Sequence, residues 1–314
     1  MEAMIVMSKI IRYWNQNRKQ IIIVIAIIAF IIIMLRVINN LAKQINKSNN
    51  NTNTISKVTD LQKPTKSTIT GQNVPETVTK ENTDIIKTFV DYCNNNQEQK
   101  SYELLSNDCK EEFNNNINVF INDYYNRIFK TKKTYNLELL YTEAGSYTYK
   151  ITYYEDNLLA TGGTGANNNF EDYITIINQD GERKLNINNF IKNQEINKTQ
   201  VTNNIEITIK SKKVYRSYEQ YKITIKNNNS TTILLSDGKN SEDICLLDKN
   251  DTKYEAFLHE IPEYNLLLRA GRTTELNISF NKIYAPTRVI EKVQFSNITL
   301  NQETNTKTSI TIKI

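Results

Sequence analysis

The sequence holds few of the residues that bind metals or form cross-links. Its 314 residues include three cysteines and one histidine, His259. An odd, sparse set of cysteines is not a disulfide framework, and one histidine falls short of the three or four ligands of a zinc site. Cys93 and Cys109 could pair, but buried free thiols are the favoured interpretation. We expect no metal site and no cofactor, and we expect His259 to be an ordinary surface or hydrogen-bonded side chain.

The folded part of the chain also lacks an excess of positive charge. Residues 1–80 carry 11 Lys and Arg against 3 Asp and Glu, whereas the remainder carries 28 against 31. A nucleic-acid-binding domain needs its basic surface on the folded part, where it contacts phosphates. We therefore expect no nucleic-acid partner.

Long apolar stretches are absent apart from one near the start. Residues 21–35 carry no charge, and Arg36, Val37 and Ile38 extend the run. At 1.5 Å per residue the segment 21–38 spans about 27 Å, close to the ~30 Å hydrocarbon core of a bilayer. No small-x-small cleavage site follows it, and it is apolar on every side, which argues against a signal peptide and a buried core helix. The sequence predicts a transmembrane helix over 21–38 that contacts the lipid bilayer.

The flanks of this run predict an orientation and a tether. Basic residues are slightly more numerous on its N-terminal side, which favours a cytoplasmic N-terminus over residues 1–20. Residues 39–80 lose hydrophobic periodicity and cannot bury enough apolar surface to offset chain entropy, so we expect a flexible stalk. The expected localisation is a single-pass cell-membrane protein with its C-terminal domains outside the cytoplasm.

Helical spacing gives way to strand alternation between residues 81 and 195. Apolar side chains recur at helical spacing over 85–93, 102–113 and 117–128, with Asn82, Thr83 or Asp84 available as the first N-cap. Strand patterns follow over 135–141, 147–153, 173–177 and 185–187. Asp180 and Gly181 form a tight hairpin turn in this interpretation. Helices followed by an antiparallel sheet predict an α+β domain.

The order of these elements resembles the nuclear-transport-factor-like cone superfamily, particularly at residues 102–106, Tyr-Glu-Leu-Leu-Ser, which open the second helix. The resemblance implies a curved sheet wrapped around a long helix, with a pocket inside. Enzymes of that superfamily place a carboxylate, a Tyr or a His in the cone. Tyr153, Tyr173, Asp91 and Asp172 could in principle serve, but no acid–base pair can be named. We therefore expect no catalytic activity.

A glycine-rich loop covers residues 161–166. Phosphate-binding loops of similar composition lead from a strand into a helix, whereas strand patterns lie on both sides here. A hairpin loop at the rim of a binding mouth is the favoured interpretation. The candidate mouth residues are Tyr153, Gly162, Gly163, Gly165 and Tyr173.

Short strands and turns alternate over residues 200–314. The strand-like runs are 205–214, 218–225, 231–235, 244–247, 254–258, 273–280, 289–300 and 309–314. Such a series predicts an all-β sandwich. Residues 221–227, an alternating strand that enters a polar turn, and 268–280, a turn that enters a strand, resemble immunoglobulin-like modules of bacterial surface proteins. In the second stretch Leu276, Ile278 and Phe280 face the expected core.

These features together predict the fold class and a function. The expected fold is an α+β cone-like domain over 81–195 and an all-β immunoglobulin-like sandwich over 200–314, preceded by one transmembrane helix. The leading hypothesis is a membrane-anchored extracytoplasmic binding or scaffolding protein of a bacterial cell envelope, with an envelope protein or wall polymer as its partner. Two alternatives are a bitopic subunit of a conjugation or secretion channel and a cone-domain enzyme or small-ligand carrier.

Overall fold

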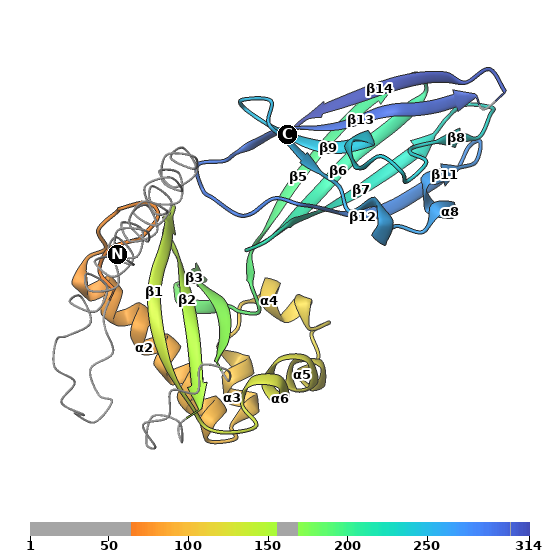
Figure 1. Cartoon of the computed structure of the whole chain (residues 1–314). Helices are drawn as coiled ribbons and strands as arrows, with labels where there is room; N and C mark the ends of the chain where they lie inside the picture. Colours follow the sequence, from red (N-terminus) through yellow and green to blue (C-terminus); the bar gives the residue numbers. More distant parts are fainter. Residues whose placement is uncertain (1–63, 156–168, 302) are drawn as a thin grey trace, which may run out of the picture. The chain divides into compact units, whose positions relative to one another are not determined.

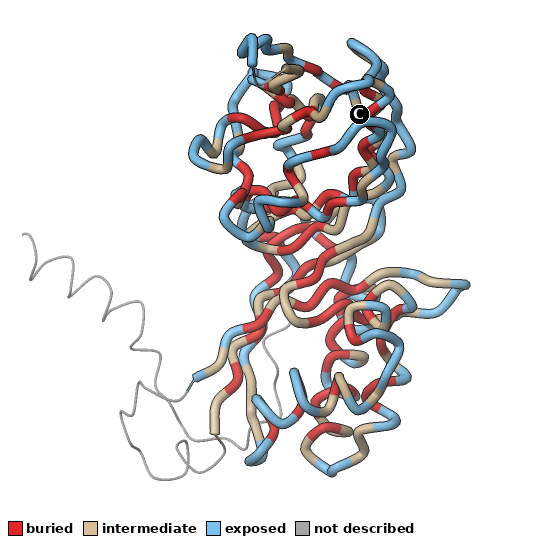
Figure 2. The backbone as a smooth tube through the Cα atoms, turned by 90° about the vertical axis from the view of Figure 1, so that its right-hand side faces the viewer, coloured by how far each residue is buried: buried red, intermediate tan, exposed pale blue. Residues whose placement is uncertain are grey.

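A computed structural model describes residues 64–155, 169–301 and 303–314 (Figure 1). All of them belong to one compact unit, Leu61–Ile314. They form mostly β-strands, and the strands pair antiparallel. Buried residues alternate with exposed ones along many of these strands (Figure 2).

The structure corrects the predicted fold class and localisation. The described residues are predominantly antiparallel β-sheet, whereas the sequence predicts an α+β domain and an all-β sandwich preceded by a transmembrane helix. None of the helices within 64–155, 169–301 and 303–314 has both the length and the apolar character of a bilayer span. This finding overturns the expected fold class, the single-pass description and the cell-membrane localisation, because each included such a helix. The segment 21–38, the preceding residues 1–20 and most of the predicted stalk lie outside the described residues.

The longest helix among the described residues, α2 (Glu76–Asn94), begins earlier than its apolar stripe suggests. Pro75 precedes it with φ −53°, and Glu76 places a carboxylate in the first turn, where the helix dipole favours negative charge. The prediction of an N-cap at residues 82–84 is therefore wrong. Asn82 instead lies buried in the helix interior and donates its amide to the Tyr149 hydroxyl at 3.1 Å. The apolar pattern does not mark the first two turns of α2, because the polar residue Asn82 occupies a buried position and is hydrogen-bonded to the sheet.

Short helices follow α2 and pack with it against a four-stranded sheet. They are α3 (Glu98–Glu103), α4 (Asn107–Glu112), α5 (Ile117–Phe120), the π-helical segment η1 (Ile121–Tyr125) and α6 (Asn126–Ile128). The last three are continuous in sequence and confirm the predicted helical stretch over 117–128. Ser106 caps α4 by accepting a hydrogen bond from the Cys109 amide at 3.0 Å.

The first sheet contains four antiparallel strands in the order β1-β2-β3-β4. Its strands are β1 (Lys133–Glu143), β2 (Ser146–Glu155), β3 (Phe170–Gln179) and β4 (Glu182–Asn186). Asp180 and Gly181 join β3 to β4 with φ values of 56° and 84°, which confirms the predicted tight turn. Aromatic and aliphatic side chains fill the space between this sheet and the helices.

Two further sheets enclose a second hydrophobic core. One has the order β12-β7-β6-β5, and the other has the order β10-β9-β13-β8-β11, with β14 paired to β13. Their strands are β5 (Phe190–Thr202), β6 (Ile205–Tyr215), β7 (Glu219–Asn227), β8 (Ile233–Leu234), β9 (Ile244–Asp248), β10 (Lys253–Glu255), β11 (Leu267–Leu268), β12 (Thr273–Phe280), β13 (Ile290–Asn301) and β14 (Thr306–Lys313). The short helical turns η2 (Ser241–Asp243), η3 (Leu258–Glu260) and α8 (Glu263–Leu266) lie in the connections. Each of the eight predicted strand runs overlaps one of these strands.

The strand β5 joins the two cores and was not predicted. It begins at Phe190, whose ring packs 5.6 Å from that of Tyr215 in the first core, and then continues as a strand of the second. The predicted domain boundary at 195–200 falls inside it. A third, smaller cluster contains Leu140, Tyr141, Ile191, Val214 and Tyr284. It packs residues of β1 against residues of β5, β6 and the segment that leads into β13.

Candidate functional site

The candidate mouth residues that the structure describes do not lie together. Tyr153 is fully buried, on the side of β2 that faces the first core. Tyr173 is half-buried and packs beside the third cluster, with the Arg216 guanidinium 5.2 Å from its ring centre. The residues Gly162, Gly163 and Gly165 lie outside the described residues, as does the rest of the loop 161–166.

A buried network surrounds Asp172, another residue that the sequence marked as a candidate. Its carboxylate accepts hydrogen bonds from the Tyr124 hydroxyl at 2.8 Å and from the amides of Tyr173, Asn188 and Asn189 at 2.7 to 3.0 Å. Burial raises the pKa of Asp172, although these hydrogen bonds oppose the shift. Burial and the charge of Asp172 also raise the pKa of Tyr153. The network holds β3 to the residues that follow β4 and to the helical segment.

The interior of the first core is occupied by its own side chains. Its largest fully buried members are Phe89, Phe120, Tyr124, Tyr149, Tyr153 and Phe190. Phe120 and Tyr124 stack with ring centres 5.9 Å apart, and Phe129 meets the edge of Tyr153 at 5.4 Å. Packed aromatic rings thus fill this part of the first core.

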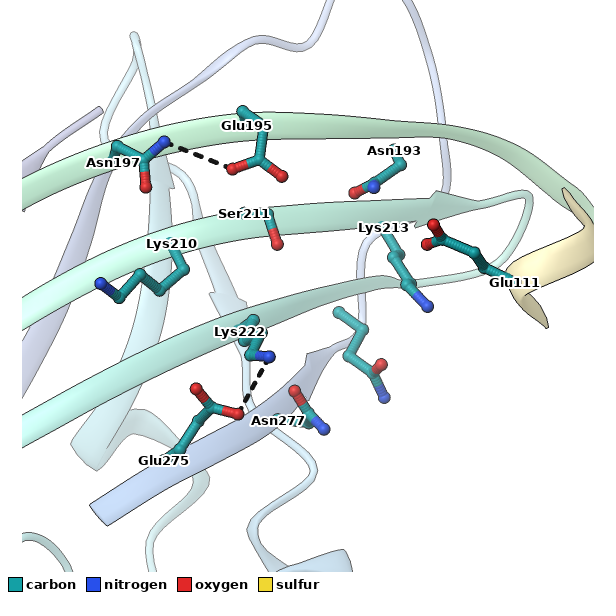
Figure 3. Close-up of a pocket in the computed structure, with 11 residues that line it drawn as sticks. Glu111, Asn193, Glu195, Asn197, Lys210, Ser211, Lys213, Lys222, Glu275 and Asn277 are labelled. Atoms are coloured by element: carbon teal, nitrogen blue, oxygen red, sulfur yellow. Dashed lines mark hydrogen bonds and ion pairs between the residues drawn. The ribbon is translucent and has the colours of Figure 1, made fainter. Parts of the chain in front are cut away.

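A polar groove lies on the outer face of the sheet β5-β6-β7-β12 (Figure 3). It has a volume of about 500 Å³. Its lining residues are Glu111, Asn193, Glu195, Asn197, Lys210, Ser211, Lys213, Gln220, Lys222, Glu275 and Asn277. We refer to these residues as the polar groove.

Strand alternation explains why polar side chains gather there. In β7 the residues Tyr221, Ile223 and Ile225 face the second core, so Gln220 and Lys222 point outward. The register pairs Lys213 with Gln220 and Ser211 with Lys222, which continues the polar row across β6. Extending the row to the neighbouring strands adds residues of β5 and β12.

Two irregularities in the strands coincide at the groove. The register between β6 and β7 shifts between Ile209 and Ser211, and the register between β5 and β6 shifts between Glu195 and Lys198. Each inserted residue bends its strand and increases the local twist. Lys210 and Asn197, which lie in these irregular stretches, both line the groove.

The charges of the groove are mixed, and two of them form an exposed ion pair with each other. Lys222 contacts Glu275 at 3.0 Å across β7 and β12, with both side chains about half exposed. Asn197 donates to Glu195 at 3.3 Å. Ion pairs this exposed contribute roughly 0–1 kcal/mol to stability, so a partner can replace them at little cost. Among the described residues Lys210 forms no ion pair.

Sequence reasoning did not find the groove, for an identifiable reason. The strand β5 supplies three of its residues, and its sequence from Lys192 to Thr202 has no apolar alternation that would mark a strand. The outward positions of β6 and β7 were visible in the alternation of residues 205–214 and 218–225, but the inserted residue in β6 shifts their parity.

The remaining sequence candidates are ordinary structural residues. His259 is exposed in η3 and lies edge-on to Phe257 at 6.0 Å, which confirms a surface position. Cys93, Cys109 and Cys245 are buried free thiols. Within the described part of the chain, no group of three or more His, Cys, Asp or Glu side chains could hold a metal ion.

Comparison with known proteins gives little guidance. No protein-family model matches the chain, and no curated protein matches it. One solved structure, a conserved hypothetical protein from Bacillus anthracis, is 18% identical over 33% of this chain and 88% of its own, with a TM-score of 0.25. A likeness that weak carries no argument about fold or function.

Proposed function

We propose that this chain is a binding or scaffolding protein whose polar groove takes a polar segment of a protein partner that carries both signs of charge. The supporting observation is the groove itself, a depression of about 500 Å³ across four strands with three lysines and three glutamates in its lining. Side chains that alternate in charge favour a partner with the complementary arrangement and disfavour a partner of single sign.

The burial of Asp172, Tyr124 and Tyr153 favours binding over catalysis in the first core. Asp172, Tyr124 and Tyr153 have raised pKa values because they are buried among packed rings, away from the groove. Catalytic acids and bases combine a shifted pKa with access to a substrate. The proposal therefore includes no catalytic step.

Charge reversal within the groove tests this function. Full-length wild-type protein and the Lys210→Glu variant would be used to capture partners from extracts of the source cells, and the captured protein would be purified and titrated by calorimetry. We expect Lys210→Glu to weaken binding about tenfold or more, since a like charge would then face the partner. Lys239→Glu, in an exposed loop outside the groove, is the matched control and should bind as the wild type does.

A double variant tests whether binding depends on where the charges lie as well as on their presence. The double variant Lys222→Glu with Glu275→Lys keeps the ion pair but reverses its direction across β7 and β12. It should fold normally and bind more weakly than the wild type. Equal binding by wild type, Lys210→Glu and the double variant would refute the groove as the binding surface, as would capture of a polysaccharide in place of a protein.

A further inference from the structure

A second cavity, of about 400 Å³, lies on the opposite side of the same sheet from the polar groove. Its charged residues are Glu143, Lys192, Lys212, Glu219, Lys282 and Arg288. Tyr284, Ala285, Pro286 and Val289, from the segment between β12 and β13, form much of the remaining wall. We call this cavity the basic pocket.

The pocket occupies positions that strand alternation assigns to the core face. Tyr221, Ile223 and Ile225 of β7 face the second core, and Glu219 continues the same row beyond it. The register pairs Lys212 of β6 with Tyr221, so Lys212 also faces inward. Charged groups at inward positions lose hydration that hydrogen bonds and ion pairs must replace.

Glu219 is fully engaged by groups of the protein. Lys282 donates to it at 2.6 Å, with both side chains only 2% exposed, and the Tyr221 hydroxyl donates at 3.0 Å. Lys212 approaches the same carboxylate only to 3.8 Å, and its side chain is 13% exposed. The close partner of Glu219 is therefore Lys282, and Lys212 is left with a distant contact.

Glu143 is likewise engaged, by Lys192 and Tyr284. Lys192 contacts its two carboxylate oxygens at 2.8 and 3.0 Å, and the Tyr284 hydroxyl donates to it as well. Arg288 is exposed at the mouth of the pocket and makes no ion pair with the residues that the structure describes. Four cations and two carboxylates thus leave a local charge of +2, carried chiefly by Lys212 and Arg288.

We propose that the basic pocket binds the phosphate group of an organic phosphomonoester, with Lys212 and Arg288 contacting the phosphate oxygens. A phosphomonoester carries about −1.5 to −2 charges at neutral pH, which matches the excess of the pocket. The planar guanidinium suits paired hydrogen bonds to two phosphate oxygens. Ala285, Pro286 and the exposed side chain of Val289 provide an apolar wall for the organic part. This site shares only Asn193 with the polar groove and does not depend on the proposed partner of the groove.

The state of Lys212 agrees with this assignment. Burial lowers its pKa, Glu219 opposes that shift, and the neighbouring charge of Lys282 adds to it. A phosphate held beside Lys212 would supply the counter-charge that the protein provides only at a distance.

Calorimetric titration of the full-length protein tests the proposal with two probes, inorganic phosphate and phenyl phosphate, at constant ionic strength. We expect saturable binding of both at one site, tighter for phenyl phosphate because its ring contacts the apolar wall. Arg288→Gln should weaken both roughly ten- to hundredfold, as expected for loss of hydrogen bonds to a charged group. Arg272→Gln, the same change at an exposed arginine distant from the pocket lining, should leave both unchanged.

Two further variants keep the outcome unambiguous. Lys212→Met retains the aliphatic stem and removes the charge, so it should fold and should bind phosphate at least tenfold more weakly. Val289→Ser should weaken phenyl phosphate and leave inorganic phosphate unchanged. Absence of saturable binding in the wild type, or unaltered affinity in both Arg288→Gln and Lys212→Met, would overturn the proposal.

Discussion

At the scale of single residues, Asp172 links three parts of the first core through its buried carboxylate. Removing its carboxylate would leave the buried Tyr124 hydroxyl with only the Tyr153 hydroxyl, 3.4 Å away, and would leave the half-buried amides of Asn188 and Asn189 without their acceptor. We expect Asp172→Ala to lower the free energy of unfolding by about 2–4 kcal/mol, because each buried unsatisfied donor costs roughly 1–3 kcal/mol. Denaturant titration monitored by circular dichroism measures the loss. Asp84→Ala, on the exposed face of α2, should change stability by less than about 0.5 kcal/mol.

Glu143 should make stability depend on pH. Burial raises the pKa of its carboxyl, but hydrogen bonds from Lys192 and Tyr284 outweigh burial and hold the pKa below its ordinary value. A carboxyl with a lowered folded-state pKa stabilises the protein above its unfolded-state pKa of about 4.3, and this contribution is lost as the pH falls through the folded-state pKa. Glu143→Gln should therefore be less stable than wild type at pH 7, and the difference should shrink on acidification. Glu138→Gln, exposed on the same strand, is the control; a gap that persists in acid would contradict the assignment.

At the scale of elements, a buried helix cap should contribute more to the free energy of unfolding than an exposed one. Ser106 accepts from the Cys109 amide while its hydroxyl donates to Asn186 in a fully buried setting, whereas Asn116 caps α5 at the exposed surface. We expect Ser106→Ala to cost about 1–2 kcal/mol and Asn116→Ala about 1 kcal/mol or less, both measured by chemical denaturation. Equal costs would mean that the bond to Asn186 adds nothing.

How well the sequence predicts an element depends on whether one face of it meets a core. The runs 205–214 and 273–280 alternate because their inner residues are buried, and the structure places strands at both. The sequence does not predict β5 because much of this strand lies at the edge of a sheet and carries polar side chains on both faces. The polar groove and the basic pocket share part of this cause, since β5 supplies residues to both and the inserted residue in β6 shifts the parity of the lysines that line them.

At the scale of the whole described unit, β5 and β6 carry side chains of both large cores, and the third cluster lies between them. The cores should therefore unfold together. Exposure of the buried thiols during unfolding can test this expectation. Cys93 and Cys109 belong to the first core, and Cys245 lies in β9. With single-cysteine variants, all three should become reactive towards a thiol reagent at the same denaturant concentration.

Native reactivity provides the baseline for that measurement. Burial raises the pKa of the Cys93 thiol from 9.0 to about 12, so its thiolate fraction falls about a thousandfold. Exposure of Cys245 at a lower denaturant concentration than Cys93 would show instead that the second core opens independently.

The inserted residue at Lys210 has a consequence for any change in the length of β6. The register passes from Ile209 with Ile223 directly to Ser211 with Lys222, so Lys210 is an extra residue in β6 with no counterpart in β7. Deleting Lys210 would make this stretch regular and would leave Lys212 facing the pocket and Lys213 facing the groove. Deleting Lys212 would instead turn Lys213 towards the pocket and Val214 towards solvent, because side chains alternate with a period of two. The length of β6 beyond Lys210 therefore determines both surfaces together, whereas Lys210 itself can be lost without changing either row.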